Sequence, residues 1–235
     1  MKPDIIFEND EMIICNKKAG VLAQSDRSFD VDMVSALMTY RRRKGEDVYI
    51  GVINRLDRPV SGLMVFAKSA EAAAKLNALM QKDTFNKTYM AVVAGCLKEQ
   101  EGSFTDYLIK NGRENISQIA GKDKPGAKKA VLKYELAGTK NIQLNDGTNR
   151  TVSLVKIHLI TGRHHQIRVQ FASRDLVLAG DVKYAGNHAE QTREIAEKLG
   201  IRRNCIALCA CALDVDGKHF EAEADFVKQF EYYRP

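Results

Sequence analysis

The sequence predicts an α+β fold, with a largely antiparallel mixed sheet flanked by helices. One reason is that strand-like segments are joined by hairpin turn signals, such as Asn145-Asp146-Gly147. Another is that helical segments occur among the strands without strict alternation, unlike the pattern of a parallel α/β sheet. The chain of 235 residues also contains no internal repeat and no low-complexity linker. A single domain covering residues 1–235 is therefore the simplest division.

The N-terminal part predicts a hairpin followed by a helix. Two short apolar runs, Ile5–Phe7 and Met12–Cys15, flank a turn-forming Asn-Asp pair. From Asp30, which we expect to be the N-cap, the pattern becomes helical. The face of this helix that we expect to be buried contains Val31, Val34, Leu37 and Met38.

The next elements are two strands, a helix and a further strand. Residues 49–53 and 63–68 are strand-like and are separated by a loop at 54–61. Ser69 is placed to cap an alanine-rich helix, and 87–95 is again strand-like. The residues of this helix that we expect to be buried are Ala73, Leu76 and Met80.

The remaining chain predicts one long loop, a hairpin, two helices and two terminal strands. The polar segment 111–129 contains three glycines and a proline, and we expect it to be a loop. Its cations, which are either simply solvated or follow a nucleic-acid backbone, are Lys122, Lys124, Lys128 and Lys129. A hairpin turns at 145–147, and helices are expected at 163–173 and 190–199.

Composition excludes several classes of protein. The N-terminus places acidic residues among its apolar ones, so it is not a secretory signal. No apolar run is long enough to span a bilayer. Five cysteines are an odd number for a disulfide framework, so we expect a cytoplasmic protein. The formal charge of +6 is compatible with an anionic partner but does not identify one.

The cysteines predict core packing and not a metal site. Cys205, Cys209 and Cys211 lie close together, but no second cysteine pair accompanies them at the spacing of a zinc site. The segment 206–215, IALCACALDV, instead matches a buried strand in which cysteine is a small hydrophobe. We expect no metal and no other cofactor.

Two polar motifs interrupt apolar patterns in the first half of the chain. Asp57 lies between Arg55 and Arg58, and such neighbours favour an ionised carboxylate. Taken alone, the motif favours a turn aspartate beside surface arginines. Tyr89 falls within an apolar strand, where it either packs in the core or offers a ring for stacking on a base.

A third polar motif begins the helix expected at 163–173. Ile167 and Phe171 are spaced to anchor this helix to the core, and His164 and Arg168 share a neighbouring face. On a helix, the side chains of His164 and His165 would point about 100° apart, which argues against a metal site. The donors at this helix start suit a phosphate or a carboxylate.

Three motifs in this order resemble those of the RluA family of pseudouridine synthases. They are RLDRPVSG (55–62), KTYMAVVAG (87–95) and TGRHHQIRVQFAS (161–173). Three further stretches support the resemblance: NKKAGVLAQSD (16–26), GDVKYAG (180–186) and IALCACALDV (206–215). The resemblance covers roughly residues 10–220 and implies the pseudouridine synthase fold, without the S4-like domain that many longer relatives carry.

The resemblance implies isomerisation of uridine to pseudouridine in RNA, without a cofactor. Asp57 would be the catalytic nucleophile, and both attack on C1′ and a glycal-type route remain open. Arg168 would pair with Asp57 and keep it ionised, and Tyr89 would stack on the uracil. Arg55 would occupy the space that the flipped nucleotide leaves.

The other residues that we expect to contact RNA are cationic or polar. They are Arg42, Arg43, Arg163, His165 and Gln166. The basic tract 41–44 ends a helix, so it either caps the helix or contacts phosphates. The partner would be rRNA or tRNA, and we expect a monomer with no obligate protein partner and no membrane association.

The sequence departs from the family pattern at three positions. Asn54 stands where the family commonly has His, Val60 where it has Thr, and His164 where it has Thr. These changes affect local hydrogen bonds and leave Asp57, Tyr89 and Arg168 in place. Two other functions are considered: a non-catalytic RNA-binding or chaperone module, and a glycosylase that releases uracil.

Overall fold

A computed structural model describes residues 1–25, 30–80 and 85–230. The chain divides into two compact units. Unit 1 contains residues 1–87 and 210–223, and unit 2 contains residues 88–209 and 224–235. The predicted division into a single domain stays a prediction. Within the described residues, no helix is both long enough and apolar enough to cross a membrane.

The sheet of unit 1 begins with the predicted N-terminal hairpin. Its strands are β1 (Ile5–Glu8), β2 (Met12–Lys17), β3 (Gly51–Val52), β4 (Ser61–Ala67), β10 (Leu208–Val215), which belongs to this unit from Ala210 on, and β11 (Lys218–Glu221). β1 pairs with β2, β2 and β3 pair with β4, and β10 pairs with β11, all antiparallel. The buried strand predicted at 206–215 is confirmed as β10.

Two helices belong to unit 1: α1 (Met33–Arg43) and α2 (Ala70–Leu79). The Oγ of Ser69 accepts a hydrogen bond from the Ala72 backbone N–H at 3.1 Å, which confirms this predicted N-cap. Strands β2 and β4, helix α2 and the end of β10 share one apolar core, which includes Met12, Ile14, Leu63, Val65, Leu76, Leu213 and Val215. The predicted core position Leu76 is confirmed.

Gly62 shows why the motif before β4 ends in glycine. Its φ is +118°, and a Cβ at this position would lie 2.3 Å from the carbonyl oxygen of Ala210. Only glycine tolerates such a close approach of two backbones. The residue therefore allows β4 and β10 to lie against each other immediately after the loop that carries Asp57.

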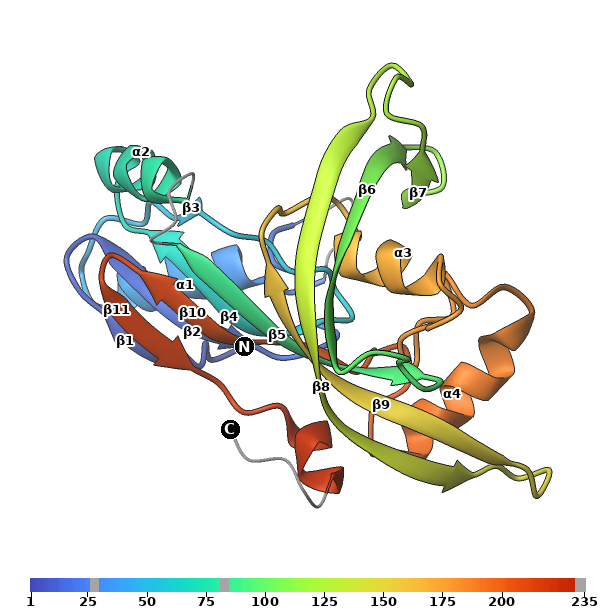
Figure 1. Cartoon of the computed structure of the whole chain (residues 1–235). Coiled ribbons are helices and arrows are strands. Elements are labelled where there is room, and N and C mark those ends of the chain that lie inside the picture. The colour runs from blue at the N-terminus through green and yellow to red at the C-terminus, as the bar shows by residue number, and fades with distance from the viewer. Residues whose placement is uncertain (26–29, 81–84, 231–235) are drawn as a thin grey trace. The chain divides into compact units, whose positions relative to one another are not determined.

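The strands of unit 2 are also antiparallel. Its strands are β5 (Asn86–Ala94), where the chain enters this unit, β6 (Glu101–Asn111), β7 (Ile116–Ala120), β8 (Lys128–Gln143) and β9 (Asn149–Leu159). The order across the sheet is β5-β9-β8-β6-β7. β8 and β9 form a long hairpin, and its predicted turn at 145–147 is confirmed (Figure 1).

Helix α3 (Gln166–Ala172) packs against β6 and β7 (Figure 1). Ile167 and Phe171 are buried, as predicted, and the Phe171 ring lies 5.0 Å from the Phe104 ring. Helix α4 (Ala189–Lys198) confirms the helix predicted near 190–199. Two short 3-10 helices, Gly186–His188 and Asp225–Gln229, complete this unit. The predicted α+β class with a largely antiparallel sheet is confirmed.

The predicted start and the predicted buried face of α1 are wrong. The N-cap of α1 is Asp32 and not Asp30, because the Asp32 carboxylate accepts from the Ser35 backbone N–H at 3.0 Å. Val31 therefore precedes the helix and is 55% exposed. The helix buries Met33, Ala36 and Leu37, so of the predicted face only Leu37 is fully buried.

The segment 111–129 is not one loop. It contains strand β7 and the start of β8, and β7 pairs with β6 from Tyr107–Ala120 to Asn111–Ile116. The sequence pattern did not predict β7, because polar residues occupy most positions around it. Strand pairing, and not the apolar pattern, therefore decides the structure of this segment.

Candidate active site

Asp57 lies in the loop between β3 and β4, where the sequence places it. Its side chain is half-buried, and its backbone carbonyl accepts a hydrogen bond from the Val60 N–H at 3.0 Å. Asn54 begins the loop and is buried. Its side chain donates to the Leu63 carbonyl at 3.2 Å and accepts from the Val65 N–H at 2.7 Å. Asn54 therefore fastens the loop to β4 through the backbone of that strand.

Lys17 holds the same loop from its other side. Its side chain is completely buried, and Nζ donates to the backbone carbonyls of Lys18, Val21 and Arg58 at 3.3, 2.8 and 3.3 Å. A buried ammonium needs such acceptors to replace water. Because Arg58 directly follows Asp57, Lys17 fixes the backbone next to the predicted nucleophile.

The two arginines beside Asp57 differ in their surroundings. Arg58 binds the Asp30 carboxylate at 2.8 Å and the Gly20 carbonyl at 3.1 Å. Arg55 is exposed, as a residue that enters an RNA helix must be. Its predicted role stays a prediction.

Tyr89 and Arg168 both belong to unit 2. Tyr89 is on β5, opposite Ile157 of β9, and is 6% exposed. Arg168 is in α3 and is also buried. The predicted pairing of Arg168 with Asp57, which lies in unit 1, stays a prediction.

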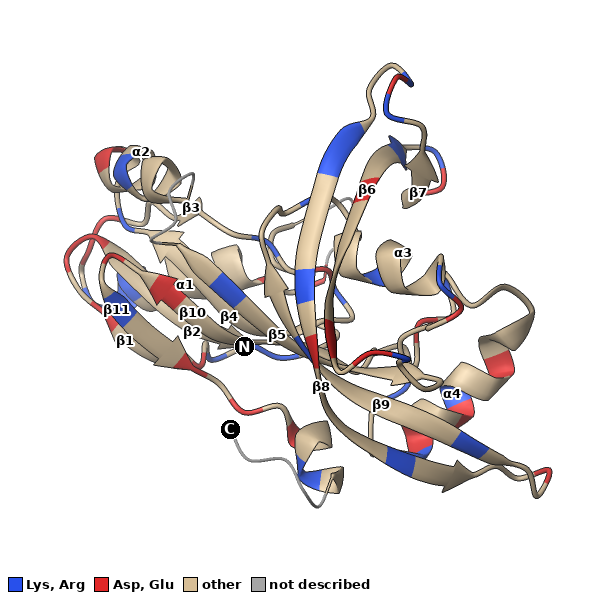
Figure 2. Ribbon diagram, viewed as in Figure 1, with Lys and Arg blue, Asp and Glu red and all other residues tan. Residues whose placement is uncertain are grey.

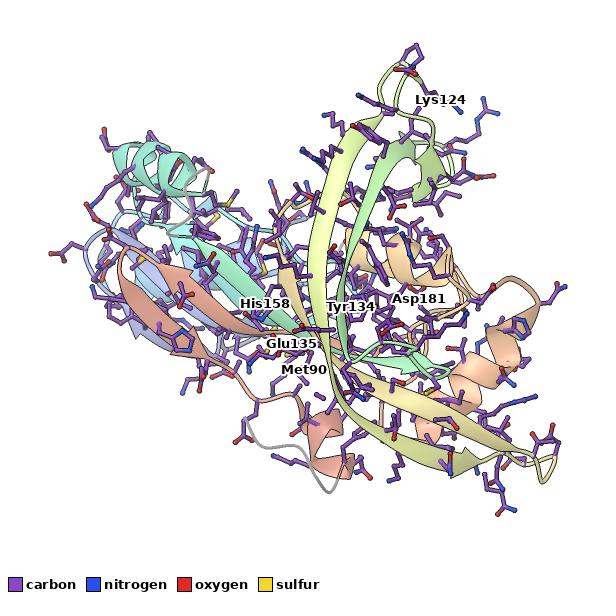
Figure 3. The ribbon with its side chains drawn as sticks, viewed as in Figure 1. Met90, Lys124, Tyr134, Glu135, His158 and Asp181 are labelled. Atoms are coloured by element: carbon purple, nitrogen blue, oxygen red, sulfur yellow. The ribbon has the colours of Figure 1, made fainter. Side chains whose placement is uncertain are left out.

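Within unit 2, the acidic partner of Arg168 is Asp181, which Figure 3 labels near helix α3. Nε donates to Oδ2 and Nη2 donates to Oδ1, both at 2.7 Å, and both side chains are buried. The guanidinium carbon also lies 5.2 Å from the centre of the Tyr184 ring. A bidentate pair of this kind fixes the plane of the guanidinium.

Helix α3 starts later than its sequence predicts. His165 is the N-cap and has φ +53°, a left-handed conformation that no regular helix contains. His164 therefore precedes the helix and does not share a helical face with Arg168. The predicted 100° divergence of the two histidines is also wrong, because their rings are stacked with centroids 3.8 Å apart.

His165 is buried and lies in a cationic environment. Burial, followed by the positive charge of Arg168, lowers the pKa of His165 from 6.5 to about 2. The imidazole is therefore neutral at physiological pH. Its Nδ1 lies 2.8 Å from the Tyr184 hydroxyl.

Gln166 uses its whole side-chain amide inside unit 2. Oε1 accepts from the Thr161 hydroxyl at 2.8 Å and the Arg163 N–H at 3.0 Å, and Nε2 donates to the Val131 carbonyl at 3.1 Å. These contacts favour a structural role, and the predicted RNA contact of Gln166 stays a prediction. Arg163 is exposed, and its Nε donates to the Lys129 carbonyl at 2.9 Å.

The basic tract at the end of α1 separates into two kinds of residue. Arg41 is buried and binds the Glu46 carboxylate and the carbonyls of Tyr49 and Lys68. Lys44 pairs with Glu8 and Glu46. Arg42 and Arg43 are exposed, so they are the members of the tract that suit phosphate contacts.

The β7–β8 connection also carries several cations. Figure 2 shows Lys and Arg on β8 and on the loop that joins it to β7, and Figure 3 labels Lys124 at this loop.

Among the described residues, no group of three or more His, Cys, Asp and Glu side chains is arranged to hold a metal ion.

Three further residues organise these two regions, although the sequence predicted no role for them. They are Lys17, Asp181 and Tyr184. Asp181 had a usable signal, since an acidic residue after a glycine in an otherwise apolar segment often has a buried cationic partner. Nothing in the local sequence predicted the burial of Lys17.

Comparison with known proteins identifies the family of the chain. The family model described as RNA pseudouridylate synthase matches residues 11–173, which include Asp57, Tyr89 and Arg168. The uncharacterized RNA pseudouridine synthase YhcT of Bacillus subtilis is 32% identical over 184 residues, which cover 78% of this chain and 58% of that protein. The chain thus spans less than two thirds of this relative's length.

A second relative matches over most of its own length. tRNA pseudouridine synthase C of Haemophilus ducreyi is 31% identical over 205 residues, which cover 86% of this chain and 82% of that protein.

Two solved human structures share the fold. RNA Pseudouridylate Synthase Domain Containing 4 has a TM-score of 0.74 at 16% identity, covering 99% of this chain and 94% of its own. RNA Pseudouridylate Synthase Domain Containing 1 has a TM-score of 0.70 at 22% identity, covering 94% and 82%. With the family model spanning all three motifs, the chain belongs to the RNA pseudouridylate synthase family.

Proposed function

We propose that this protein isomerises uridine to pseudouridine in structured RNA, with Asp57 as the nucleophile and without a metal or organic cofactor. The observation that carries the proposal is the family match over residues 11–173, which contains all three predicted catalytic residues. The half-buried position of Asp57, in a loop anchored by Asn54 and Lys17, supports it. The anchors restrict the movement of the carboxylate that must meet the ribose.

The proposed reaction breaks the bond between N1 and C1′ and forms a bond between C5 and C1′. The proton on C5 leaves, and N1 gains a proton. Asp57 acts at the ribose, Tyr89 stacks on the uracil while it turns, and Arg168 keeps Asp57 ionised and oriented. Arg55 fills the space left by the flipped nucleotide, which costs a few kcal/mol to extrude.

The proposed substrates are tRNA first and rRNA second. Several relatives carry the name tRNA pseudouridine synthase C, which favours testing tRNA before rRNA. Exposed Arg42, Arg43 and Arg163 would add affinity through phosphates and not through base recognition. The monomeric state and the cytoplasmic location remain predictions.

The test measures tritium release from RNA that contains 5-tritiated uridine. Asp57→Asn should abolish release, because the amide cannot act as a nucleophile, while RNA binding measured by filter retention persists. Asp10→Asn is the matched control, since Asp10 is an exposed carboxylate in the turn between β1 and β2. Release by Asp57→Asn at the rate of Asp10→Asn would refute the proposed role.

The same assay separates the other two functions. A glycosylase would produce free uracil, whereas a synthase retains all of the base in the RNA. A non-catalytic RNA-binding module would release no tritium even as the unaltered protein. The comparisons do not favour this second alternative, because the named relatives are synthases.

A further inference from the structure

Arg168 is held by one short segment of unit 2, Asp181–Tyr184. Asp181 supplies the two 2.7 Å hydrogen bonds, and the Tyr184 ring lies next to the guanidinium. The two partners act differently, since Asp181 fixes the plane of the guanidinium and the ring limits its displacement. The exposed fractions are 5% for Arg168 and 1% for Asp181, so bulk water does not compete for these contacts.

The Tyr184 hydroxyl connects this segment to the start of α3 and to β7. It accepts a hydrogen bond from the Ser117 backbone N–H at 2.8 Å, and it also lies 2.8 Å from His165 Nδ1. One hydroxyl therefore connects the N-cap residue of α3 with the backbone of β7.

Lys183 and the stacked histidine extend the same attachment to the turn between β6 and β7. Lys183 Nζ donates to the carbonyls of Glu114 and Asn115, both at 3.2 Å. His164 lies 3.1 Å from the side-chain oxygen of Asn115 and 2.9 Å from the Ser117 hydroxyl. Asp181 thus binds Arg168, Lys183 binds the turn, and Tyr184 contacts the helix start.

The segment is itself anchored at its beginning. Gly180 donates its N–H to the Thr192 carbonyl at 2.9 Å, and the Thr192 hydroxyl donates to the Leu178 carbonyl at 2.9 Å. Gly180 has φ +85°, and a Cβ there would lie 2.4 Å from the Cys205 carbonyl oxygen. Glycine alone fits this position, so the backbone before Asp181 has little freedom.

We propose that Asp181 and Tyr184 are positioning residues of the reaction, which act by holding the Arg168 guanidinium in its productive orientation. The inference rests on the proposed function, because it assigns these residues a task through Arg168. Neither residue needs to touch the RNA. Their loss should therefore lower kcat and leave KM and RNA affinity unchanged.

The experiment compares kcat and KM for tritium release by Asp181→Asn and Tyr184→Phe. We expect a loss in kcat of about a hundredfold for Asp181→Asn, since a small misplacement of a catalytic group has effects of this size. For Tyr184→Phe, which keeps the ring and removes one hydroxyl, we expect about tenfold. Unaltered kcat in both variants would overturn the proposal.

Matched controls exist in the same unit. Asp175→Asn removes an exposed carboxylate, and Tyr107→Phe removes the hydroxyl of a tyrosine on β6 that has no hydrogen-bond partner among the described residues. Both controls should keep the kcat of the unaltered protein. The thermal unfolding of all four variants is measured first. The kinetics are then measured at a temperature at which every variant is fully folded.

A double-mutant cycle separates positioning from general stabilisation. If Asp181 acts through Arg168, Asp181→Asn should have much less effect on kcat in an Arg168→Lys background than in the unaltered protein. Full additivity of the two effects would refute the proposal. The Asp57→Asn assay tests the proposed function separately. If the unaltered protein is active but the effects of Asp181→Asn and Arg168→Lys are additive, the positioning role is refuted and the proposed function stands.

Discussion

The loop of Asp57 and the start of helix α3 are both held by several hydrogen bonds, but through different groups. The loop is fastened mainly through main-chain atoms, which bind Lys17 and Asn54. The helix start is fastened through side chains, which include Gln166, His165, Tyr184 and Asp181. The first region depends on two residues, whereas the second depends on a network.

This difference has a consequence for the tolerance of each region to substitution. Backbone carbonyls are present whatever the residue, so the loop should accept changes at its exposed side chains. Loss of its buried donor should be costly, because several carbonyls then lack a partner. In the network, several side chains together hold the helix start. Substitution of one of them should therefore lower the free energy of unfolding by less, and the effects of two substitutions should not be additive.

The largest expected effect is that of Lys17→Met. The methionine fills the volume but donates no hydrogen bond to the carbonyls of Val21 and Arg58. We expect the free energy of unfolding to fall by about 3 kcal/mol, with loss of most of the activity. Urea unfolding measures the change, and Lys18→Met is the control, since Lys18 is exposed. Equal stability of the two variants would show that the ammonium does not hold the loop.

An intermediate effect is expected for Gln166→Leu. Leucine keeps the apolar volume but leaves the Val131 carbonyl and the Arg163 N–H without their side-chain partner. We expect a loss of about 2 kcal/mol in the free energy of unfolding. Gln118→Leu changes an exposed residue on β7 and should stay close to the unaltered protein. A loss as large as that of Lys17→Met would contradict the proposed contrast between the two regions.

The smallest expected effect concerns pH and His165. Since its folded pKa is lowered to about 2, the unfolded chain takes up a proton near pH 6.5 that the folded protein does not. Stability should therefore decrease as the pH falls below 6.5. From pH 7 to pH 5.5 this one group should account for about 1 kcal/mol.

The comparison protein for the pH experiment is His165→Asn, which lacks the titrating group. Asparagine tolerates the left-handed backbone at this position and keeps a polar side chain. Unfolding measured between pH 7 and pH 5.5 should depend less on pH in this variant. Parallel curves for the two proteins would exclude His165 as a source of the acid sensitivity.

Short-range patterns predicted elements well where they coincided with a local hydrogen bond. Ser69 is an example, since its hydroxyl binds the backbone three residues ahead. Asp30 is a counterexample. The N-cap is Asp32, whose carboxylate binds the Ser35 backbone N–H, while Asp30 pairs with Arg58. The pairing of Asp30 with a residue distant in the sequence cannot be seen in the local pattern.

The sequence alone determined the α+β class, the hairpins and the three motifs that place the chain in its family. It could do so because these features depend on neighbours a few residues away or on residue identity at fixed spacing. The tertiary structure decided which polar groups are buried together. Lys17 reaches a carbonyl 41 residues away, and Tyr184 reaches Ser117 across 67 residues. Burial makes these contacts strong, and burial is a property of the packed molecule and not of a local pattern.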